Sequence, residues 1–549
     1  MLAWTVYISF LGAAWMFLLK PDDARSARIV ALLTSTAGLL AAVAGALLQP
    51  AGGALHTVTR VPWVPKLGIH YHLAADGISL TLVILTGLAA VAGVLFSWNI
   101  QHRAREFFAF YLALIGAVYG VFLSFDLFLL FVFYELAIVP KYFLIAIWGS
   151  TRRQYGAMKL ALYSFLGSAM VLVGLLAAYV VAGGRTLDLV ELSRFPFPRS
   201  FQMWAFPLVF TGFAILAGLW PFHTWAPTGH VAAPTAASML LAGVIMKLGA
   251  YGCLRVAMTL FPLGLHDWET PVLGLASWRD VFGLLAVTGI VYGALVALVQ
   301  KDFKFVIGYS SVSHMGFVVL GLMTLGTVGI SGAVLQMFSH GIIAGLLFGV
   351  VGRMIYERTH TRELDELEAM RLSRALPFAA GTFVVAGLAS MGMPGFSGFA
   401  AEFQVLLGAW KAFPTYAVLA GFGLLVGVAY TLRVIQKAFF SETLGAAAAV
   451  AGAPGAGEAL APTVPASSAW SNPVAMAGKE HGGPDLGGAG KGESEPHALE
   501  DITVPERLGA AMLILCTLVV GLYPRLLLDW IVPAVESPLM EGILKGAGR

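Results

Sequence analysis

Charge is scarce in this sequence. Only 11% of its 549 residues are charged, whereas 58% are hydrophobic, and the net charge is +3 at pH 7. So small a net charge, without any block of basic residues, argues against nucleic-acid binding. Such a low share of charged residues also excludes a soluble domain of this length.

Cysteine is almost absent as well. Cys253 and Cys516 each stand alone in an apolar run, without a second Cys or a His at metal-ligand spacing. We therefore interpret both as small buried hydrophobes, and the sequence has no iron–sulfur or haem signature. The glycines of GFGLLVG (421–427) lie inside an apolar run rather than after a strand, so they do not indicate a nucleotide loop. We expect this chain to bind neither a metal nor a cofactor.

Long apolar runs recur from end to end. Each is about 20 residues long, which is enough to cross a membrane as a helix. Alternating segments of about ten residues, typical of barrels, are absent. The sequence predicts an all-α polytopic membrane protein, and the first run is expected to be a span rather than a removed signal. The expected spans, about fourteen, lie near 2–19, 28–48, 76–98, 106–125, 127–148, 157–182, 203–220, 232–259, 280–299, 304–326, 328–351, 376–412, 414–437 and 506–531.

Basic residues gather in alternate loops. Because such loops usually stay in the cytoplasm, they predict that both termini are periplasmic. Three arginines in an opposite loop, Arg185, Arg194 and Arg199, weaken this contrast. The basic loops carry Lys20, Arg25 and Arg28; Arg103 and Arg105; Arg152, Arg153 and Lys159; Lys301 and Lys304; Arg353, Arg358, Arg362, Arg371 and Arg374; and Arg433 and Lys437.

One long segment interrupts the apolar pattern. Residues 441–504, most clearly 443–500, are rich in Ala, Gly and Pro and have no apolar periodicity. Such a composition is typical of a disordered linker, here placed before the last span.

Two of the expected spans contain Gly and Pro breaks. One reads LAGLWPFHTWAPTGHVAAPT (216–235), and the other reads ASMGMPGFSGFAAEF (389–403). Paired breaks in two halves of a polytopic chain indicate an internal repeat with a transport site where the helices unwind. The alternative is that each proline merely kinks a packed helix.

Ionisable residues nevertheless occur within these spans. An ionisable side chain at mid-membrane costs roughly 2.5–3.5 kcal/mol, so each is a functional candidate. Each could also be structural, since a Glu–Lys pair can join two helices and Lys304 could reach the interface. Acids, lysines and histidines spread over several spans could form one hydrated row that carries protons, because a neighbouring charge decides which group is protonated. Lysines among the acids favour protons over sodium. The candidates are Glu135, Lys247, Lys304 after Asp302, His314, His340 and Glu402.

Five motifs in this order resemble the antiporter-like subunits of respiratory complex I, in particular the M subunit of bacterial NADH-quinone oxidoreductase, the counterpart of mitochondrial chain 4. YHLAADGISLTLVIL (71–85) also fits that family, and the resemblance covers nearly all of the chain except the linker. The five motifs are FYELAIVPKYFLIAIWG, WPFHTWAPTGHVAAPTAASMLLAGVIMKLGAYG, QKDFKFVIGYSSVSHMGF, FSHGIIAGLLF and GMPGFSGFAAEF.

The resemblance implies fourteen helices that include two inverted five-helix repeats. It places N-terminal helices in 1–105, the repeats in 106–260 and 279–440, the linker in 441–504 and a last helix in 505–531. It implies proton translocation in a bacterial inner membrane, driven by quinone reduction in other subunits of the enzyme. Flavin, iron–sulfur clusters and quinone would then belong to those partners, and neighbouring antiporter-like subunits and lipids would surround this chain. The proton-carrying residues would be Glu135, Lys247, Lys304, His314, His340 and Glu402.

One position departs from the family pattern. The family has a lysine on the seventh helix, where this sequence has Leu216, and an apolar residue where this sequence has Lys141 after Pro140. Our hypothesis is that Lys141 replaces the missing lysine as the partner of Glu135. In a regular helix the two positions differ by about 240° and 9 Å, so the proline would have to relax this geometry. The rival is that Lys141 faces an interface and leaves Glu135 unpaired.

The sequence thus predicts a proton-translocating membrane-arm subunit of NADH-quinone oxidoreductase without a redox centre of its own. One alternative is a subunit of a multisubunit sodium/proton antiporter, which shares this scaffold. A second is a structural spacer that has lost transport together with the seventh-helix lysine. A third, weaker one is a membrane-arm subunit of a hydrogenase or related dehydrogenase. His223 and His230, near the first break, are expected to shape the loop rather than carry protons.

Overall fold

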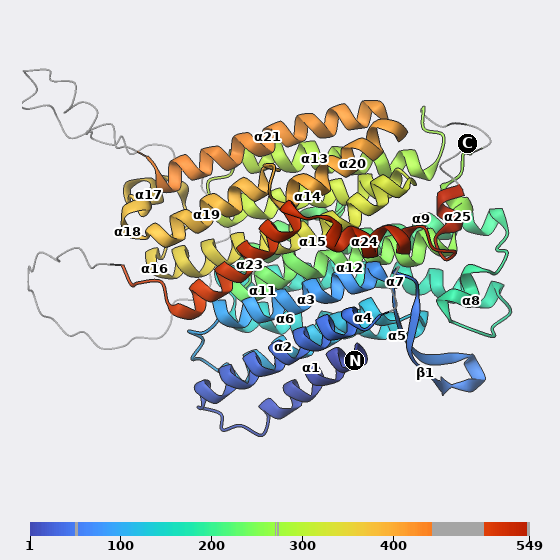
Figure 1. Cartoon of the computed structure of the whole chain (residues 1–549), viewed down its shortest axis with the longest axis horizontal. Coiled ribbons are helices and arrows are strands. Elements are labelled where there is room, and N and C mark those ends of the chain that lie inside the picture. The colour runs from blue at the N-terminus through green and yellow to red at the C-terminus, as the bar shows by residue number, and fades with distance from the viewer. Residues whose placement is uncertain (50–52, 269–270, 272–273, 442–498, 546–549) are drawn as a thin grey trace, which may run out of the picture.

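The chain forms a bundle of roughly parallel helices (Figure 1). The computed structural model describes residues 1–549 apart from 50–52, 269–270, 272–273, 442–498 and 546–549. Among the described residues, twelve helical stretches are long and apolar enough to cross a membrane, and Ala3–Met16 and Pro377–Ser390 are shorter apolar helices. The predicted all-α polytopic class is confirmed, whereas the exact count of fourteen spans is not.

The first half of the chain runs from α1 to the end of the seventh long helical stretch, Thr235–Met258. Its elements are α1 (Ala3–Met16), α2 (Ala24–Leu47), β1 (His56–Val64), η1 (Pro65–Leu67), β2 (Ile69–Ala75), α3 (Gly77–Phe96), α4 (Ala104–Leu123), α5 (Leu127–Leu136), α6 (Ile138–Trp148), α7 (Arg153–Val181), α8 (Leu189–Ser193), α9 (Arg199–Ala217), η2 (Phe222–Thr224), α10 (Trp225–Ala232), α11 (Thr235–Leu240), the π-helix η3 (Leu241–Ile245), α12 (Met246–Gly252) and the π-helix η4 (Cys253–Met258).

The second half begins after a short connection. Its elements are η5 (Pro262–Leu265), α13 (Trp278–Val299), α14 (Phe303–Met323), α15 (Thr327–Gly349), the π-helix η6 (Val350–Tyr356), α16 (Glu357–Thr359), α17 (Leu364–Ala369), α18 (Leu372–Ala375), α19 (Pro377–Ser390), α20 (Ser397–Ala412), α21 (Pro414–Phe439), α23 (Val504–Leu522), α24 (Arg525–Val535) and α25 (Glu541–Lys545). The predicted linker lies almost entirely outside the described residues.

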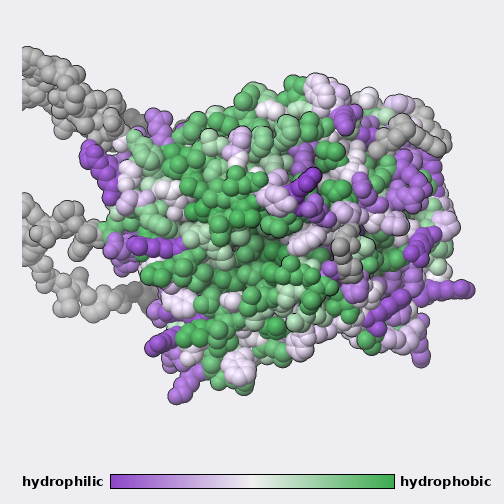
Figure 2. All heavy atoms as spheres, in the orientation of Figure 1, coloured by the Kyte–Doolittle hydropathy of each residue, from purple (hydrophilic) through white to green (hydrophobic). Residues whose placement is uncertain are grey.

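The surface has the pattern expected of a membrane-spanning bundle. Figure 2 shows a broad hydrophobic belt between two hydrophilic ends. The end at the left carries α16, α17 and α18, and the end at the right carries β1, α8 and α25 (Figure 1). Because the helices alternate in direction, the predicted basic loops all fall at the end with α16 to α18, which we call the Lys/Arg-rich side.

A β-hairpin at the opposite end was not predicted. Strands β1 and β2 pair antiparallel, with His56 opposite Ala75 and Val64 opposite Ile69. Pro62 lies inside β1, and a proline there weakens the strand signal in the sequence. We call the end that carries this sheet the hairpin side.

The last predicted span ends earlier than expected. Helix α23 stops at Leu522, and α24 is a separate helix, so one continuous span over 506–531 was wrong. Pro524 ends the helix because residues before a proline disfavour helical geometry.

Both predicted breaks are present. Helix α9 ends at Ala217 with Gly218 in the left-handed conformation (φ +81°), and α19 is separated from α20 by residues 391–396. The breaks bring α10 and the start of α20 into the interior of the bundle.

Candidate functional site

Four of the predicted residues form a continuous row of side chains. Lys247 Nζ lies 2.7 Å from His340 Nδ1. The rings of His340 and His314 lie with their centroids 5.3 Å apart. His314 Nδ1 lies 2.9 Å from Glu402 Oε1. All four are at most 7% exposed, so the row is enclosed within the protein rather than facing lipid.

Glycines allow the two helices that begin this row to approach. A Cβ at Gly243 would meet the Gly341 carbonyl oxygen at 3.1 Å, and a Cβ at Gly341 would meet the Gly243 oxygen at 2.6 Å. Gly341 directly follows His340 and Gly243 lies one turn before Lys247. This close backbone contact therefore brings the lysine and the histidine within hydrogen-bonding distance.

The backbone around Lys247 is also irregular. The π-helices η3 and η4 flank α12, and π-helical turns occur frequently at functional sites. The Lys247 ammonium donates to the carbonyl of Ala242, which lies in η3. The π-turn thus supplies an acceptor that offsets part of the cost of burying the amine.

The second break positions Glu402. Gly392, within the break, has a φ of +70°, and a Cβ there would meet Glu402 Oε2 at 2.8 Å. Both observations require glycine at this position, so the break makes room for the carboxylate. Ser339, Ser397 and Thr517 hold the broken helix to α15 and α23 through two 2.8 Å hydroxyl contacts.

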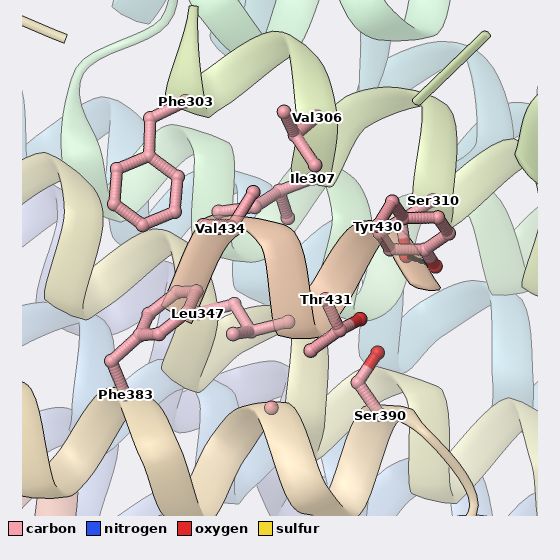
Figure 3. A pocket seen from close by; sticks show the side chains of 11 residues that line it. Phe303, Val306, Ile307, Ser310, Leu347, Phe383, Ser390, Tyr430, Thr431 and Val434 are labelled. Carbon is pink, nitrogen blue, oxygen red and sulfur yellow. Dashed lines mark hydrogen bonds between the residues drawn. The ribbon is translucent and has the colours of Figure 1, made fainter. Parts of the chain in front are cut away.

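Two polar residues extend the row. Gln336 Nε2 donates to Glu402 Oε1 at 3.1 Å. Ser390 Oγ lies 3.3 Å from His314 Nε2, and Ser390 also lines a small cavity between α14, α15, α19 and α21 (Figure 3). Sequence reasoning missed both residues. Gln336 stands one turn before His340 in an apolar helix, and that spacing was an available signal.

Lys304 lies apart from this row. It is 2% exposed, and its ammonium donates to the Ala233 carbonyl at 3.3 Å. His230 lies close enough to Lys247, Lys304 and His340 for electrostatic interaction with all three. Neither ring nitrogen of this fully buried histidine has a hydrogen-bond partner among the described residues. His230 was expected to shape the loop, but its electrostatic interaction with two candidate lysines makes it a candidate as well.

Glu135 and Lys141 form a second site on α5 and α6. Lys141 is 2% exposed and donates to Ser164 Oγ at 3.0 Å on α7. Glu135 interacts electrostatically with Lys141. Both residues are described by the structure, and no ion pair joins them; Glu135 Oε1 has no hydrogen-bond partner. Their relation is therefore electrostatic without direct contact.

Leu216 lies on α9 and is 2% exposed. The position at which the family carries a lysine is thus fully enclosed in this chain. The indole N–H of Trp225, on α10, donates to the Ile215 carbonyl at 2.8 Å. This hydrogen bond attaches the end of α9 to the segment after the break.

Buried ion pairs outside the row attach α3 and α23 to the segments that continue α12 and α15. On the hairpin side, Arg255 Nη2 lies 2.5 Å from Asp76 Oδ2, and both residues are fully buried. On the Lys/Arg-rich side, Glu506 lies 2.5 Å from Arg353 and 2.9 Å from Arg358. The two contacts of Glu506 attach α23 directly to η6 and α16. None of these residues was predicted as a site.

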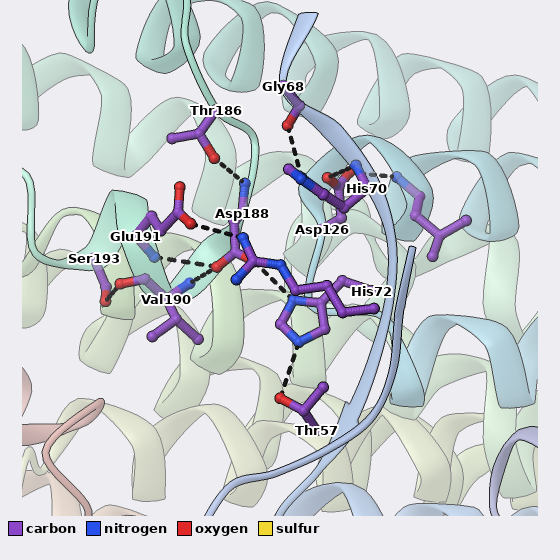
Figure 4. Close-up of polar contacts among 12 residues, drawn as sticks. Thr57, Gly68, His70, His72, Asp126, Thr186, Asp188, Val190, Glu191 and Ser193 are labelled. Atoms are coloured by element: carbon purple, nitrogen blue, oxygen red, sulfur yellow. Dashed lines mark hydrogen bonds and ion pairs between the residues drawn. The ribbon is translucent and has the colours of Figure 1, made fainter. Parts of the chain in front are cut away.

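A polar cluster joins the hairpin to α8 (Figure 4). His72 Nδ1 lies 2.7 Å from Asp188 Oδ2, and its other nitrogen lies 3.3 Å from the Thr57 hydroxyl. Arg60 lies 3.4 Å from Asp188 and 2.7 Å from Glu191. Burial by itself would raise the pKa of Asp188. The hydrogen bond and the charge of His72 oppose this effect, and with the other partners they outweigh it, so the pKa of Asp188 lies below the usual 3.8. The Asp188 carboxylate is therefore charged at neutral pH.

The row is suited to proton transfer rather than metal binding. Among the described residues, no group of three or more His, Cys, Asp or Glu side chains could hold a metal ion. An imidazole can accept a proton on one nitrogen and release it from the other, and two imidazoles stand between an amine and a carboxylate here. The row thus joins an amine and a carboxylate through two groups that can carry a proton, with hydrogen bonds at its two ends and a ring contact in the middle.

Known proteins share both the sequence and this architecture. The family described as NADH:quinone oxidoreductase/Mrp antiporter, TM, matches residues 124–427. NADH-quinone oxidoreductase subunit M of Rhodobacter capsulatus is 37% identical over 438 residues, covering 77% of this chain and 82% of that protein. NAD(P)H-quinone oxidoreductase chain 4 1 of Synechococcus sp. (strain JA-2-3B'a(2-13)) is 39% identical, covering 70% and 72%.

The chain belongs to the NADH:quinone oxidoreductase/Mrp antiporter family, in its subunit M or chain 4 branch. The predicted resemblance is confirmed. A chain of respiratory complex I from Thermus thermophilus superposes with a TM-score of 0.81 at 27% identity, with full coverage of both chains. A chain of the Mrp complex from Dietzia sp. DQ12-45-1b reaches 0.77 at 20% identity, covering 99% of each. At that identity the Mrp likeness is one of fold alone.

Proposed function

We propose that this chain is a proton-translocating membrane-arm subunit of an NADH-quinone oxidoreductase. The single observation that carries the proposal is the buried row Lys247–His340–His314–Glu402, whose members lie on four helices and contact one another in sequence. Family membership in the subunit M branch supports the same function.

Proton transfer along the row needs only small rearrangements. Lys247 Nζ is 2.7 Å from His340 Nδ1, and His314 Nδ1 is 2.9 Å from Glu402 Oε1. The ring contact between the two histidines is the widest step, and a bound water or a ring rotation would complete it. Because each proton changes the charge next to the following group, movement at one end of the row alters proton affinity at the other.

Glu135 and Lys141 form the second proton-carrying site of the proposal. Ser164 holds the Lys141 amine, and the charge of Glu135 acts on it without direct contact. Loss or gain of a proton at either group changes the electrostatic field in this half of the bundle. The pair thus takes the role that the family assigns to a glutamate and the lysine now replaced by Leu216.

Lys304 and His230 supply access from the Lys/Arg-rich side. Lys304 is the second residue of α14 on that side, and His230 interacts electrostatically with Lys304 and with Lys247 of the row. In this proposal the Lys/Arg-rich side is cytoplasmic, the membrane is the bacterial inner membrane and both termini are periplasmic.

Electron transfer belongs to partner subunits in this proposal. Flavin, iron–sulfur clusters and quinone would be bound there, and neighbouring antiporter-like subunits would contact this chain within the membrane arm. A sodium/proton antiporter subunit is the less supported alternative, since the relatives at 37–39% identity are quinone oxidoreductase chains.

The decisive experiment replaces Lys247 by Ala, and Glu135 by Gln, in the whole assembled complex reconstituted into vesicles. We expect NADH oxidation to continue or slow while the number of protons pumped per NADH falls. A pH-sensitive dye inside the vesicles measures pumping, and Glu363→Gln, at an exposed glutamate on the Lys/Arg-rich side, is the matched control.

Two outcomes would contradict the proposal. Unchanged pumping in assembled Lys247→Ala complexes would identify the chain as a structural spacer. Purification of the native chain without flavin and iron–sulfur subunits, together with sodium-dependent proton movement, would support the antiporter alternative.

A further inference from the structure

A cavity in the second half adjoins the row described above at Ser390. It lies between α14, α15, α19 and α21, and its eleven lining residues, all described by the structure, include no charged side chain. It has about 20 Å³ of room for the centres of water molecules, which exceeds the roughly 10–15 Å³ that one bound water needs. The cavity can therefore hold a water molecule inside the bundle.

The two ends of this cavity differ in chemistry (Figure 3). Phe303 and Phe383 lie at one end, and the hydroxyls of Ser310, Tyr430 and Ser390 lie at the other. Ser310 Oγ is 2.6 Å from the Tyr430 hydroxyl. Ser390 Oγ is 3.3 Å from His314 Nε2, the imidazole nitrogen that faces away from Glu402. The polar end thus contacts the proton-transfer row directly.

Three buried rings close the apolar end. Phe303 and Phe383 have centroids 4.9 Å apart, Phe383 and Phe439 5.3 Å, and Phe303 and Phe439 6.4 Å. Phe303 is the first residue of α14 and Phe439 the last residue of α21, and both of these helix ends lie on the Lys/Arg-rich side. The rings therefore stand between that surface and the cavity. Narrow apolar constrictions of this kind gate membrane pathways by excluding water.

Two successive residues of α14, Phe303 and Lys304, point toward different places: the cavity and the access route proposed above. Phe303 points into the cavity, whereas the neighbouring Lys304 reaches the Ala233 carbonyl after the first break. Adjacent positions on a helix differ by about 100° around its axis, so one helix end can serve two routes.

We propose that this cavity is a second proton-access branch from the Lys/Arg-rich side to His314 and Glu402, closed here by the rings of Phe303, Phe383 and Phe439. The inference rests on the proposed proton-translocating function. When the rings separate, water from that surface reaches the cavity and donates a proton to the Tyr430 hydroxyl. Protons then shift from Tyr430 to Ser310, to the cavity water, to Ser390 and to His314 Nε2, and His314 releases the proton on Nδ1 to Glu402. Only O–H and N–H bonds are made and broken, and each hydroxyl that donates a proton accepts another.

The branch is tested by opening the ring gate in the whole complex. Phe383→Ala should raise the passive proton permeability of vesicles several-fold in the absence of NADH, because water can then enter past the smaller side chain. The matched control is Phe197→Ala, since Phe197 belongs to another buried three-ring cluster, with Phe201 and Phe261, on the hairpin side. Permeability of Phe383→Ala equal to that of Phe197→Ala would overturn the proposal.

A second variant tests the hydroxyl end and does not depend on a cavity-forming change. Tyr430→Phe keeps the ring and removes only the hydroxyl that contacts Ser310. This variant should lower the number of protons pumped per NADH. Combined with Phe383→Ala, it should suppress the passive proton leak. Unchanged pumping by Tyr430→Phe, together with an undiminished leak in the double variant, would refute the branch. If Phe383→Ala does not assemble, Phe383→Leu replaces it in the leak measurement, and the same outcomes apply.

Failure of the branch is distinguishable from failure of the proposed function. If Lys247→Ala abolishes pumping while Phe383→Ala behaves as its control, only the second branch is wrong. If Lys247→Ala pumps normally, the proton-translocating function itself is wrong.

Discussion

The two charged sites of this chain differ in how their members are joined. Lys247, His340, His314 and Glu402 lie on four helices and contact one another in turn. Glu135 and Lys141 lie on consecutive helices, α5 and α6, and interact only through their electric field, while Ser164 binds the amine. Direct contact between distant segments requires close helix packing, which Gly243 and Gly341 supply where η3 meets α15.

This difference indicates that the two sites tolerate changes unequally. Proton transfer along a row of direct contacts depends on every member, because each group can pass its proton to only one neighbouring group. A pair coupled through its field depends on the presence of a charge more than on its exact position, since electrostatic interaction falls off gradually with distance.

Glu402→Gln should have the largest effect. The amide can still accept a hydrogen bond from His314 but cannot bind the proton, so we expect pumping per NADH to fall by at least about tenfold, equivalent to ~1.4 kcal/mol. Dye-monitored proton uptake by reconstituted vesicles measures this, with Glu363→Gln as the control. Normal pumping by Glu402→Gln would show that the row does not end at this carboxylate.

Lys141→Leu should reduce pumping by roughly three- to tenfold, less than the loss of Glu402. If the charge matters more than its location, Leu216→Lys added to Lys141→Leu should restore much of the activity, because it returns a lysine to the family position. Leu219→Lys, which adds a lysine nearby within the break, is the matched control. Absence of rescue by Leu216→Lys would refute the replacement hypothesis.

Gln336→Leu should have a smaller effect. It removes one N–H donor from the Glu402 carboxylate, a hydrogen bond to a charged group that contributes about 1.5–3 kcal/mol, only part of which affects transfer. We expect a roughly two- to fivefold decrease in pumping and an altered pH profile. Gln436→Leu, at an exposed position of α21, should match the unchanged protein. An identical pH profile in both variants would contradict a role for Gln336.

Asp188→Asn should affect the hairpin more than pumping. Removing one partner of a buried pair costs ~3 kcal/mol or more, so amide exchange in residues 56–75 should accelerate while pumping changes by less than about twofold. Glu191→Gln, in an exposed pair with Arg60, should change exchange little.

The pH dependence of the same contact has a defined sign. The folded pKa of Asp188 is lowered, so its stabilisation is present above the usual value of 3.8 and is lost as pH falls through the lowered value. Hairpin exchange, corrected for its intrinsic pH dependence, should therefore stay constant near neutrality and rise only in strong acid. A rise between pH 5 and 7 would contradict this assignment.

Much of the fold could be predicted from apolar run lengths and from two Gly/Pro breaks. The hairpin could not, because Pro62 interrupts β1 and its register depends on contacts with the loop that carries Asp188. The end of the last span at Leu522 was also missed, since hydropathy continues beyond the break at Pro524.

Part of the candidate site could be predicted because ionisable residues stand out within apolar membrane spans. Lys247, His314, His340 and Glu402 were named because ionisable groups are costly in a membrane. Gln336, Ser390, Tyr430 and the Arg255–Asp76 pair were missed. Hydroxyls and amides cost less to bury than charges, so their presence in an apolar helix gives little signal.

Apolar run lengths, Gly/Pro breaks and ionisable residue types already specify that the chain crosses a membrane many times, that two of its helices break, and which costly groups lie within the spans. Which of these groups touch depends on the folded bundle, because contact requires glycine-mediated helix approach, π-turns and side-chain direction rather than a given order along the chain. The folded bundle joins Lys247 to Glu402 through two histidines, and it leaves Glu135 and Lys141 coupled across a gap.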